Sequence, residues 1–508
     1  MAHADTAEGK WSSLEGKRQT FIGRCEKYAA FTIPKLCLPN GRSSNASSLS
    51  HDYQSVGAQC VNHLSNKLML TLFSMSRPFF RADPSASMQQ EVSEAGGDAL
   101  ASKMAEALAL GEKRAMKLLE QMGCRPRLYE AIKHLIVTGN VLLKLEKKGL
   151  RTFGLKRYVV QRSHEGTLMH LLLKSEVSFS DLEPDVQEYL TAQGEGDKKR
   201  YVLYNWIKRR DDGSYLEQQW VNTCLLDDPK FTGNYKSIDS LPYRVLTWDL
   251  AEGDDYGTGL VEDYEGDFAS LSALSESQIQ SAILASEFRW LVNPAGMTKV
   301  EDLERSSNGA ALPGTPEDIK LLQSGNGENL TIVQAIGQDY ISRIGRGFLL
   351  NSAVTRDAER VTAEEIRIQA TELETALGGV YSRLAVDFQL PMARWLCAMI
   401  ELNLDGKDFE PVIVTGLDAL SRSGEVELIK AFLMDLAALT NMPPALLQVL
   451  KLGNVARLLA AGRGLKADDY VMSEEEQEAQ QKQQAELMAQ QQATEAGIAA
   501  AAQQVAGE

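Results

Sequence analysis

The sequence has no run of about 18 consecutive apolar residues, the length that a membrane-spanning helix requires. Its first residues, MAHADTAEGKW, lack the apolar stretch of a signal peptide. The 6 cysteines are scattered, with no CxxC pair and no compact framework, as is typical of free thiols in a reducing compartment. We therefore expect a soluble protein without disulfides that is not exported through a signal peptide.

Signatures of nucleotide and metal chemistry are missing as well. The glycine–lysine pairs at 9–10 and 16–17 are followed by tryptophan and arginine, so neither supplies the hydroxyl of a GxxxxGK[ST] phosphate loop. His164, Glu165 and His170 lie near one another, but their spacing is not HExxH and the surrounding residues have β character. We expect no ATP hydrolysis, no metal site and no cofactor.

Short glycine pairs occur in YGTG at 256–259 and in IGRGF at 344–348. They are too few for a dinucleotide-binding fingerprint and are more typical of turns or of close backbone packing. Because no other enzymatic signature is present, we interpret the protein as a non-enzyme.

The chain is long enough for two or three domains, with 508 residues of which 44% are hydrophobic and 24% charged. Helical spacing of apolar residues dominates on both sides of a β-rich stretch that follows Gly139 and ends near Asp249. Within that stretch, Asp212-Gly213 between RYVLYNWIKRR and SYLEQQWV predicts a hairpin. The sequence thus predicts a helix-dominated α+β protein.

Two further helices are expected on either side of a turn-rich insert. The first extends from Thr258 to about Trp290 and has small side chains, many of them serines, that suit tight helix packing. Residues 291–336 are rich in proline and glycine and predict turns and short strands such as NLTIVQ. Helical spacing returns at Tyr340 and continues to Asn351.

The segment from Arg356 to Pro391 is the most informative part of the chain. Thr362 and Glu365 are three residues apart and form a capping box, which predicts a helix that begins near Ala363. Apolar residues then recur in steps of three and four, at Ile366, Ala370, Leu373, Leu377, Val380, Leu384 and Phe388.

This helix is expected to be very long. If it continues past Pro391 to Ile400, its length at 1.5 Å per residue is on the order of 60 Å. Gly378 and Gly379 each cost about 1 kcal/mol in a helix interior, so close packing against a neighbouring backbone is the expected compensation. By pattern alone the segment is equally typical of a long core helix.

The amino-acid sequence of this segment resembles that of head-to-tail connector, or portal, proteins of short-tailed bacteriophages (podoviruses of the Autographiviridae type). Four other segments carry the same resemblance, and together they span most of the chain: YQSVGAQCVNHLSNKLMLTLF (53–73), EAIKHLIVTGNVLL (130–143), DDYGTGLVEDYEGD (254–267) and GLDALSRSGE (416–425).

The resemblance implies a portal-type domain order. It comprises a wing (1–257) of N-terminal helices and a β-rich part, a first stem helix (258–291), a small turn- and strand-rich clip (292–336), a second stem helix (337–350), a tunnel loop (351–361), a very long helix returning to the wing (362–423), a helical crown (424–470) and a mobile Gln/Ala-rich tail (471–508).

The function that the resemblance implies is that of a structural subunit of a ring, of dodecamer type, at one vertex of the virion. Its channel would serve DNA packaging and ejection, and the protein would be in the host cytoplasm during assembly. The implied partners are further copies of the chain, double-stranded DNA bound non-specifically and transiently, terminase, major capsid and scaffold proteins, tail adaptor proteins and internal core proteins, with no membrane. Two alternatives remain: a tail or scaffold protein without a DNA channel, and a subunit of a nucleic-acid-processing motor.

Four arginines are candidates for DNA contact in the channel: Arg343, Arg346, Arg356 and Arg360. Within one chain, beside Asp357 and Glu359, they are typical of a solvated, salt-bridged face. Repeated around a ring, they would form circles of charge that touch phosphates non-specifically. The net charge of −16 suits plain solubility and a weakly binding channel wall equally well.

Overall fold

The computed structural model describes residues 6–39, 52–74, 78–84, 107–193, 200–286, 289–311, 313–322, 327–350, 373, 375–400, 409–413 and 434. The chain divides into two compact units, Met1–Thr415 and Gly416–Glu508. The second contains one described residue, Met434, so every element below belongs to the first. The crown and tail expected from the sequence lie outside the described residues.

Helices form the first part of the fold. They are α1 (Ala7–Lys17), α2 (Gln19–Phe31), α3 (Val56–Leu72), a helical stretch at residues 107–121, and α5 (Cys124–Thr138). Helix α5 packs on α2 and α3 with one face and on two strands with another, so nearly all of its apolar side chains are buried. Short 3-10 turns at Pro34–Leu36 and Leu155–Arg157 connect neighbouring elements.

Two antiparallel sheets follow, as the β-rich stretch predicts. The three-stranded sheet has the order β10-β2-β3, formed by Tyr243–Thr247, Asn140–Glu146 and Gly149–Phe153. The six-stranded sheet has the order β4-β5-β6-β7-β8, with β9 also paired to β7; its strands are Tyr158–Arg162, Leu168–Val177, Tyr201–Arg209, Tyr215–Val221, Cys224–Leu225 and Thr232–Tyr235.

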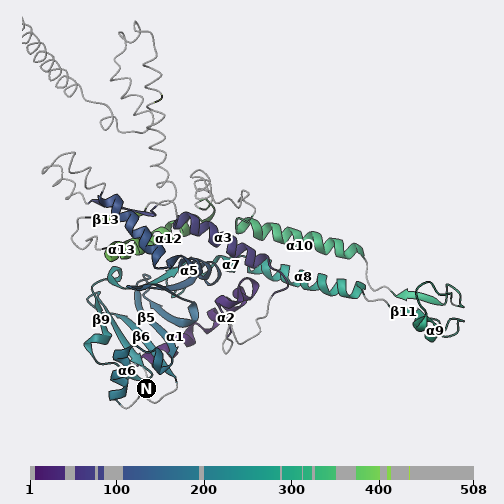
Figure 1. Ribbon diagram of the computed structural model, residues 1–508, viewed down its shortest axis with the longest axis horizontal. Coiled ribbons are helices and arrows are strands. Elements are labelled where there is room, and N and C mark those ends of the chain that lie inside the picture. The colour runs from purple at the N-terminus through teal and green to yellow at the C-terminus, as the bar shows by residue number, and fades with distance from the viewer. Residues whose placement is uncertain are drawn as a thin grey trace, which may run out of the picture. The chain divides into compact units, whose positions relative to one another are not determined.

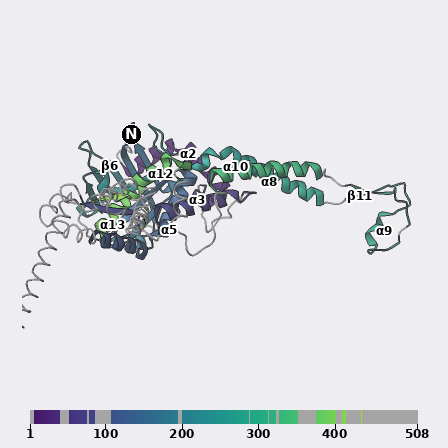
Figure 2. The ribbon, with the colours of Figure 1, turned by 90° about the horizontal axis from the view of Figure 1, so that it is seen from above.

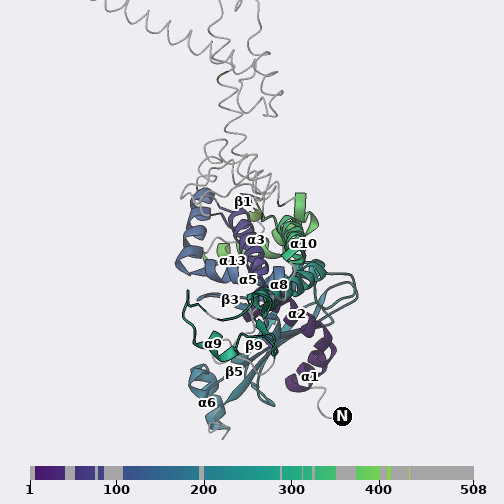
Figure 3. The same ribbon diagram turned by 90° about the vertical axis from the view of Figure 1, so that its right-hand side faces the viewer.

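The predicted hairpin at Asp212-Gly213 is confirmed. It joins β6 to β7, with Arg209 opposite Tyr215, and Gly213 adopts a positive φ of 83° that suits glycine. Helix α1 contacts β4 and β6, and Figure 3 shows it beside the strands of the six-stranded sheet. Helix α6 (Pro184–Ala192) and the 3-10 turns Phe179–Asp181, Pro229–Phe231 and Ile238–Ser240 lie between the strands in sequence.

The next elements are two long helices joined by a small strand-containing insert (Figure 1). They are α7 (Leu260–Asp263), α8 (Glu265–Ser286), β11 (Arg289–Val292), α9 (Val300–Arg305), β12 (Ile319–Leu322) and α10 (Gly327–Gly347). The strands β11 and β12 pair antiparallel, with Leu291 opposite Lys320.

Two details of this region differ from the prediction. The first helix ends at Ser286 and not near Trp290, because the backbone of residues 289–292 pairs with β12 instead. The NLTIVQ segment is not a strand but the first part of α10. Apolar residues at intervals of four, from Ile332 through Ile336 and Tyr340, keep it in helical register, and this outweighs the modest β preference of its branched side chains.

The expected very long helix is interrupted, and the prediction of one continuous rod is wrong. Gly378 has φ 47° and ψ −117°, a conformation that glycine alone adopts easily. Helix α12 (Gly379–Leu384) then leads through a π-helical turn, η6 (Ala385–Gln389), into α13 (Leu390–Met399). The capping residues Thr362 and Glu365 lie outside the described residues.

Neither glycine at this break packs closely against another described residue, contrary to the expected compensation. A Cβ atom built on Gly378 or Gly379 meets no described atom within 4 Å.

Strand β13 (Phe409–Ile413) pairs antiparallel with β1 (Phe80–Pro84), and Phe388 of the π-helical turn packs edge-on against Phe73. This part of the chain therefore returns to the core near the end of α3.

A buried carboxylate connects the two larger sheets. Glu217 on β7 is 7% exposed and accepts hydrogen bonds from the hydroxyls of Tyr243, at 2.6 Å, and Tyr235, at 2.9 Å. The side-chain amide of Asn205 donates a third, at 3.2 Å. Tyr243 belongs to the three-stranded sheet and the other residues to the six-stranded one. Burial, reinforced by the Glu217 carboxylate, raises the pKa of Tyr243, which keeps its hydroxyl protonated as a donor.

We expect Glu217→Leu to lower the free energy of unfolding by about 2–4 kcal/mol, because it leaves buried tyrosine hydroxyls and an amide without their acceptor. The same substitution at Glu176, an exposed position on β5, serves as the control and should leave stability nearly unchanged. Thermal unfolding followed by circular dichroism measures the difference. Equal melting temperatures for the two variants would contradict the role given to Glu217.

Candidate functional site

Helices α8 and α10 run antiparallel, side by side, in both Figure 1 and Figure 2. Aromatic contacts fix their register at one end, where the ring centroid of Phe348 lies 5.8 Å from that of Phe268 and 5.4 Å from that of Tyr264. Gly347 lies so close to Tyr264 that a side chain there would overlap the ring. This explains one glycine of IGRGF as a close-packing residue. We call this end the base of the hairpin.

Farther from the base, the hairpin exposes four isoleucines, which we call the isoleucine strip. Ile279 and Ile283 on α8 are 45% and 55% exposed, and Ile332 and Ile336 on α10 are 59% and 42% exposed. Each pair is four residues apart and so shares one face of its helix. Counting outward from the contact of Phe268 with Phe348, the two pairs stand at matching levels. The described residues of one hairpin therefore leave these four side chains largely uncovered.

Two of the four candidate arginines lie on α10 near the base. The guanidinium of Arg343 forms an ion pair of 3.1 Å with Asp267 on α8, lies over the Tyr340 ring, and its side chain is 60% exposed. Arg346 is exposed and donates a hydrogen bond of 3.2 Å to Ser342. The structure thus brings Arg343 and Arg346 onto one exposed face, where Arg343 already has an anionic partner. Arg356 and Arg360 lie outside the described residues.

The chain enters the hairpin through a tight backbone crossing. The side-chain amide of Asn140 donates to the carbonyl of Gly257 at 2.6 Å, and its oxygen accepts from the Gly257 amide at 2.9 Å. Beside it, Gly139 and Gly259 pass so closely that a methyl group on Gly259 would lie 2.8 Å from the Gly139 nitrogen. The VTGN and YGTG segments, distant in sequence, therefore meet, and the YGTG glycines are close-packing residues as predicted.

Ion pairs attach the start of the hairpin to α2. Arg24 pairs with Glu262 at 2.5 Å and Lys27 with Glu265 at 2.6 Å. The hydroxyl of Tyr28 also donates to Glu265, at 3.1 Å. The hydrogen bond from Lys27 lowers the pKa of Glu265 below its ordinary value. Because these pairs are partly exposed, each contributes little free energy and mainly orients the helices.

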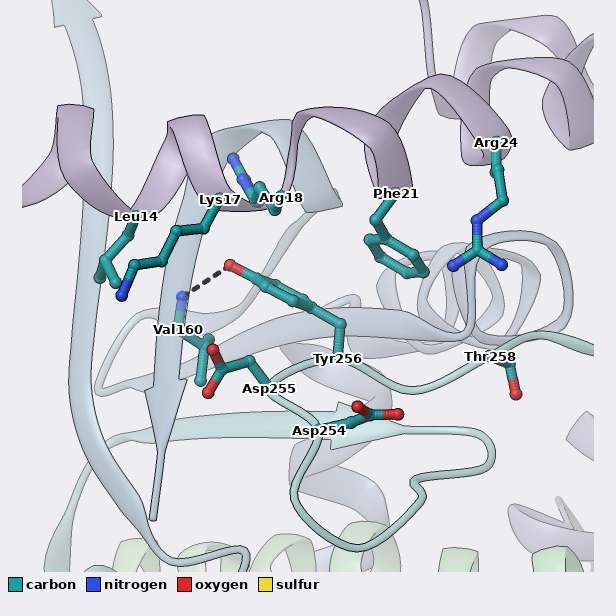
Figure 4. A pocket seen from close by; sticks show the side chains of 10 residues that line it. All are labelled: Leu14, Lys17, Arg18, Phe21, Arg24, Val160, Asp254, Asp255, Tyr256 and Thr258. Carbon is teal, nitrogen blue, oxygen red and sulfur yellow. Dashed lines mark hydrogen bonds between the residues drawn. The ribbon is translucent and has the colours of Figure 1, made fainter. Parts of the chain in front are cut away.

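A pocket of about 200 Å³ lies beside the crossing of Gly139 and Gly259, between α1–α2 and the loop that precedes α7 (Figure 4). The hydroxyl of Tyr256 accepts from the amide of Val160 at 2.9 Å, and Asp255 accepts from the amide of Arg162 at 2.5 Å. Both amides belong to β4, the edge strand of the six-stranded sheet. The loop thus covers a sheet edge, which gives its polar residues a structural role.

No group of three potential metal ligands occurs in the part of the chain that the structure describes. His170, from the cluster considered in the sequence, accepts a hydrogen bond from the indole of Trp206 at 3.3 Å. Burial, together with the nearby charges of Lys10 and Lys208, lowers the pKa of His170 to about 4. No described helix is both long and apolar enough to span a membrane.

Residues 4–471 match the family described as bacteriophage head to tail connecting protein. The chain belongs to this family. It is 32% identical over 489 residues to the portal protein of Escherichia phage T7, which covers 93% of this chain and 89% of the relative. It is 34% identical over 427 residues to the portal protein of Enterobacteria phage SP6, which covers 83% and 81%.

The chain is also similar to a third portal protein and to a chain of a solved structure. The chain is 34% identical over 414 residues to the portal protein of Pseudomonas phage phiKMV, which covers 80% of each chain. Its fold aligns with a chain in the neck of an empty GTA particle computed with C6 symmetry, at a TM-score of 0.39 and 12% identity, over 79% of this chain and 90% of that one.

Family membership makes the protein a structural, non-enzymatic part of the phage virion that forms the head-to-tail connector at the portal vertex. The resemblance seen in the sequence is confirmed, and the motor-subunit interpretation is set aside. Sequence reasoning missed Asn140 and the α2 cations Arg24 and Lys27. The sequence did contain a signal for Asn140, because TGN and YGTG both place glycine beside small polar residues. It contained none for Arg24 and Lys27, because their partners are far away in the chain.

We expect Gly259→Ala to destabilise this connector protein strongly, since the new methyl group would collide with the backbone at Gly139 and Ile136. Gly266→Ala is the matched control: it lies within α8, a Cβ there meets no described atom within 4 Å, and alanine should stabilise the helix by up to about 1 kcal/mol. Thermal unfolding of both variants tests this. A Gly259→Ala protein as stable as the Gly266→Ala protein would show that the crossing is loose.

Proposed function

We propose that copies of this chain close into a ring of dodecamer type, in which the hairpin of α8 and α10 forms the stem around a channel for double-stranded DNA. The isoleucine strip carries this proposal. Four large apolar side chains at matching levels of one hairpin are left half-exposed, and neighbouring hairpins in a ring would cover them. The family supplies the setting, a connector between head and tail.

In this proposal the described elements take the portal roles expected from the sequence. The N-terminal helices and both large sheets form the wing, α8 and α10 the stem, and the insert with β11, α9 and β12 the clip. The clip would dock terminase during packaging and tail adaptor proteins afterwards, and the wing would face major capsid and scaffold proteins. Internal core proteins would meet the crown, which lies outside the described residues.

Contact with DNA would be weak and non-specific. Arg346 is exposed at the end of α10 and has no carboxylate partner among the described ion pairs, whereas Arg343 is engaged by Asp267. Repeated around a ring, Arg346 forms one circle of positive charge within an otherwise acidic protein of net charge −16. Such a circle attracts phosphates without holding them tightly, which suits DNA that must move.

The ring is tested through the isoleucine strip. Replacing Ile283 and Ile332 together with aspartate should convert rings into monomers, because each subunit interface would bury two unpaired carboxylates. Ile238→Asp is the control, since Ile238 is 46% exposed but lies outside the hairpin. Mass photometry at micromolar concentration measures the populations. Wild-type protein that remains monomeric would refute the ring, and rings that persist in the double variant would refute this interface.

The DNA contact is tested separately with Arg346→Glu. We expect rings of normal mass whose affinity for double-stranded DNA falls several-fold, with a shallower dependence on salt concentration, because each subunit loses a phosphate partner and gains repulsion. Arg209→Glu, the same charge change at the exposed end of β6, should have little effect. Fluorescence anisotropy with labelled duplex over a salt series gives the slope of affinity against salt concentration for the unmodified protein and for Arg346→Glu. Identical slopes for the two proteins would contradict a contact between Arg346 and DNA.

A further inference from the structure

The end of α10 has an unusual backbone conformation. The amide of Leu350 donates to the carbonyl of Gly345 at 2.7 Å and that of Leu349 to Arg346 at 3.1 Å, the pattern of a helix that terminates through a left-handed residue. That residue is Leu349, with φ 56°. Glycine adopts this conformation freely, whereas a residue with a Cβ atom loses roughly 1–2 kcal/mol. Leucine at this position needs support from outside its own helix.

The support comes from α3. The ammonium of Lys67 donates to the carbonyl of Leu349 at 3.1 Å, and the Nε2 atom of His63 also lies 3.1 Å from that oxygen. Because a carbonyl can only accept, the His63 nitrogen facing it must carry hydrogen. His63 and Lys67 are four residues apart and so share one face of α3.

The charge of Lys67 is the more informative part of this contact. Its residue is only 3% exposed, and lysine is rarely buried so deeply without a specific anionic or dipolar partner. The Leu349 carbonyl lies at the negative end of the α10 dipole, where a cation is stabilised. The Leu349 side chain also packs against the main hydrophobic core.

We propose that Lys67 and His63 are positioning residues: by holding the carbonyl of Leu349 they keep it in the left-handed conformation and so set the direction in which the chain leaves the second hairpin helix. The importance of that direction for a channel rests on the proposed function, but the contact itself does not. The geometry couples α3, in the wing, to the end of α10, although 282 residues separate Lys67 from Leu349.

Hydrogen–deuterium exchange tests this coupling, with peptides that cover residues 345–350. In Lys67→Met, which keeps the side-chain length and removes the charge, the amides of Leu349 and Leu350 should exchange at least about tenfold faster than in the unmodified protein. Lys117→Met is the control, because Lys117 is exposed on the helical stretch at 107–121. Exchange within twofold of the control would overturn the proposal.

A second variant separates positioning from general damage. In the pair Lys67→Met with Leu349→Gly, glycine adopts the left-handed conformation without strain, so protection of the 345–350 peptides should return toward the unmodified level. If Lys67→Met alone fails to fold, Leu349→Gly must restore folding. Failure to rescue in either form would overturn the proposal. Exchange is measurable in rings and monomers alike, so a wild-type monomer would count against the ring and not against this contact.

Discussion

The fold depends most on the place where the backbone at Gly139 crosses the backbone at Gly259. Neither residue has a side chain, and Asn140 fills the adjacent space by bonding both polar groups of Gly257. Because the end of α5, the start of β2 and the entrance to α7 meet at this point, the direction of the hairpin is determined before α8 begins. The ion pairs from α2 to Glu262 and Glu265 then act on an element whose position is already set.

Short sequence patterns predicted those parts of the fold that depend only on residues near one another in the chain. The hairpin at Asp212-Gly213 follows from the conformational freedom of glycine, and the packing role of the YGTG glycines follows from its lack of a side chain. The prediction of one long helix was wrong because the conformational freedom of a glycine also allows it to interrupt a helix. Its apolar spacing continues through Gly378, but the pattern does not reveal whether that glycine stays helical, and the structure uses its freedom to turn the chain.

The candidate site was harder to predict because its geometry is set by contacts between distant segments. Arg343 could be identified as a basic residue on a helix, yet its partner Asp267 lies 76 residues earlier and becomes adjacent only through the aromatic contacts at the base. Asn140 and Lys67 are similar cases, since each acts on a carbonyl more than 100 residues away. No spacing rule along the chain contains that information.

The two ends of the hairpin differ in how their stability arises, and this difference bears on function. At the base, Phe268, Ile344 and Phe348 are fully buried within one chain, so this end is ordered without help. Along the isoleucine strip, the same pair of helices leaves its four isoleucines 42–59% exposed, so burial of these side chains requires another surface. A connector subunit built in this way would offer its neighbours an apolar surface that the packed base holds in place, and burial of that surface would favour association between copies.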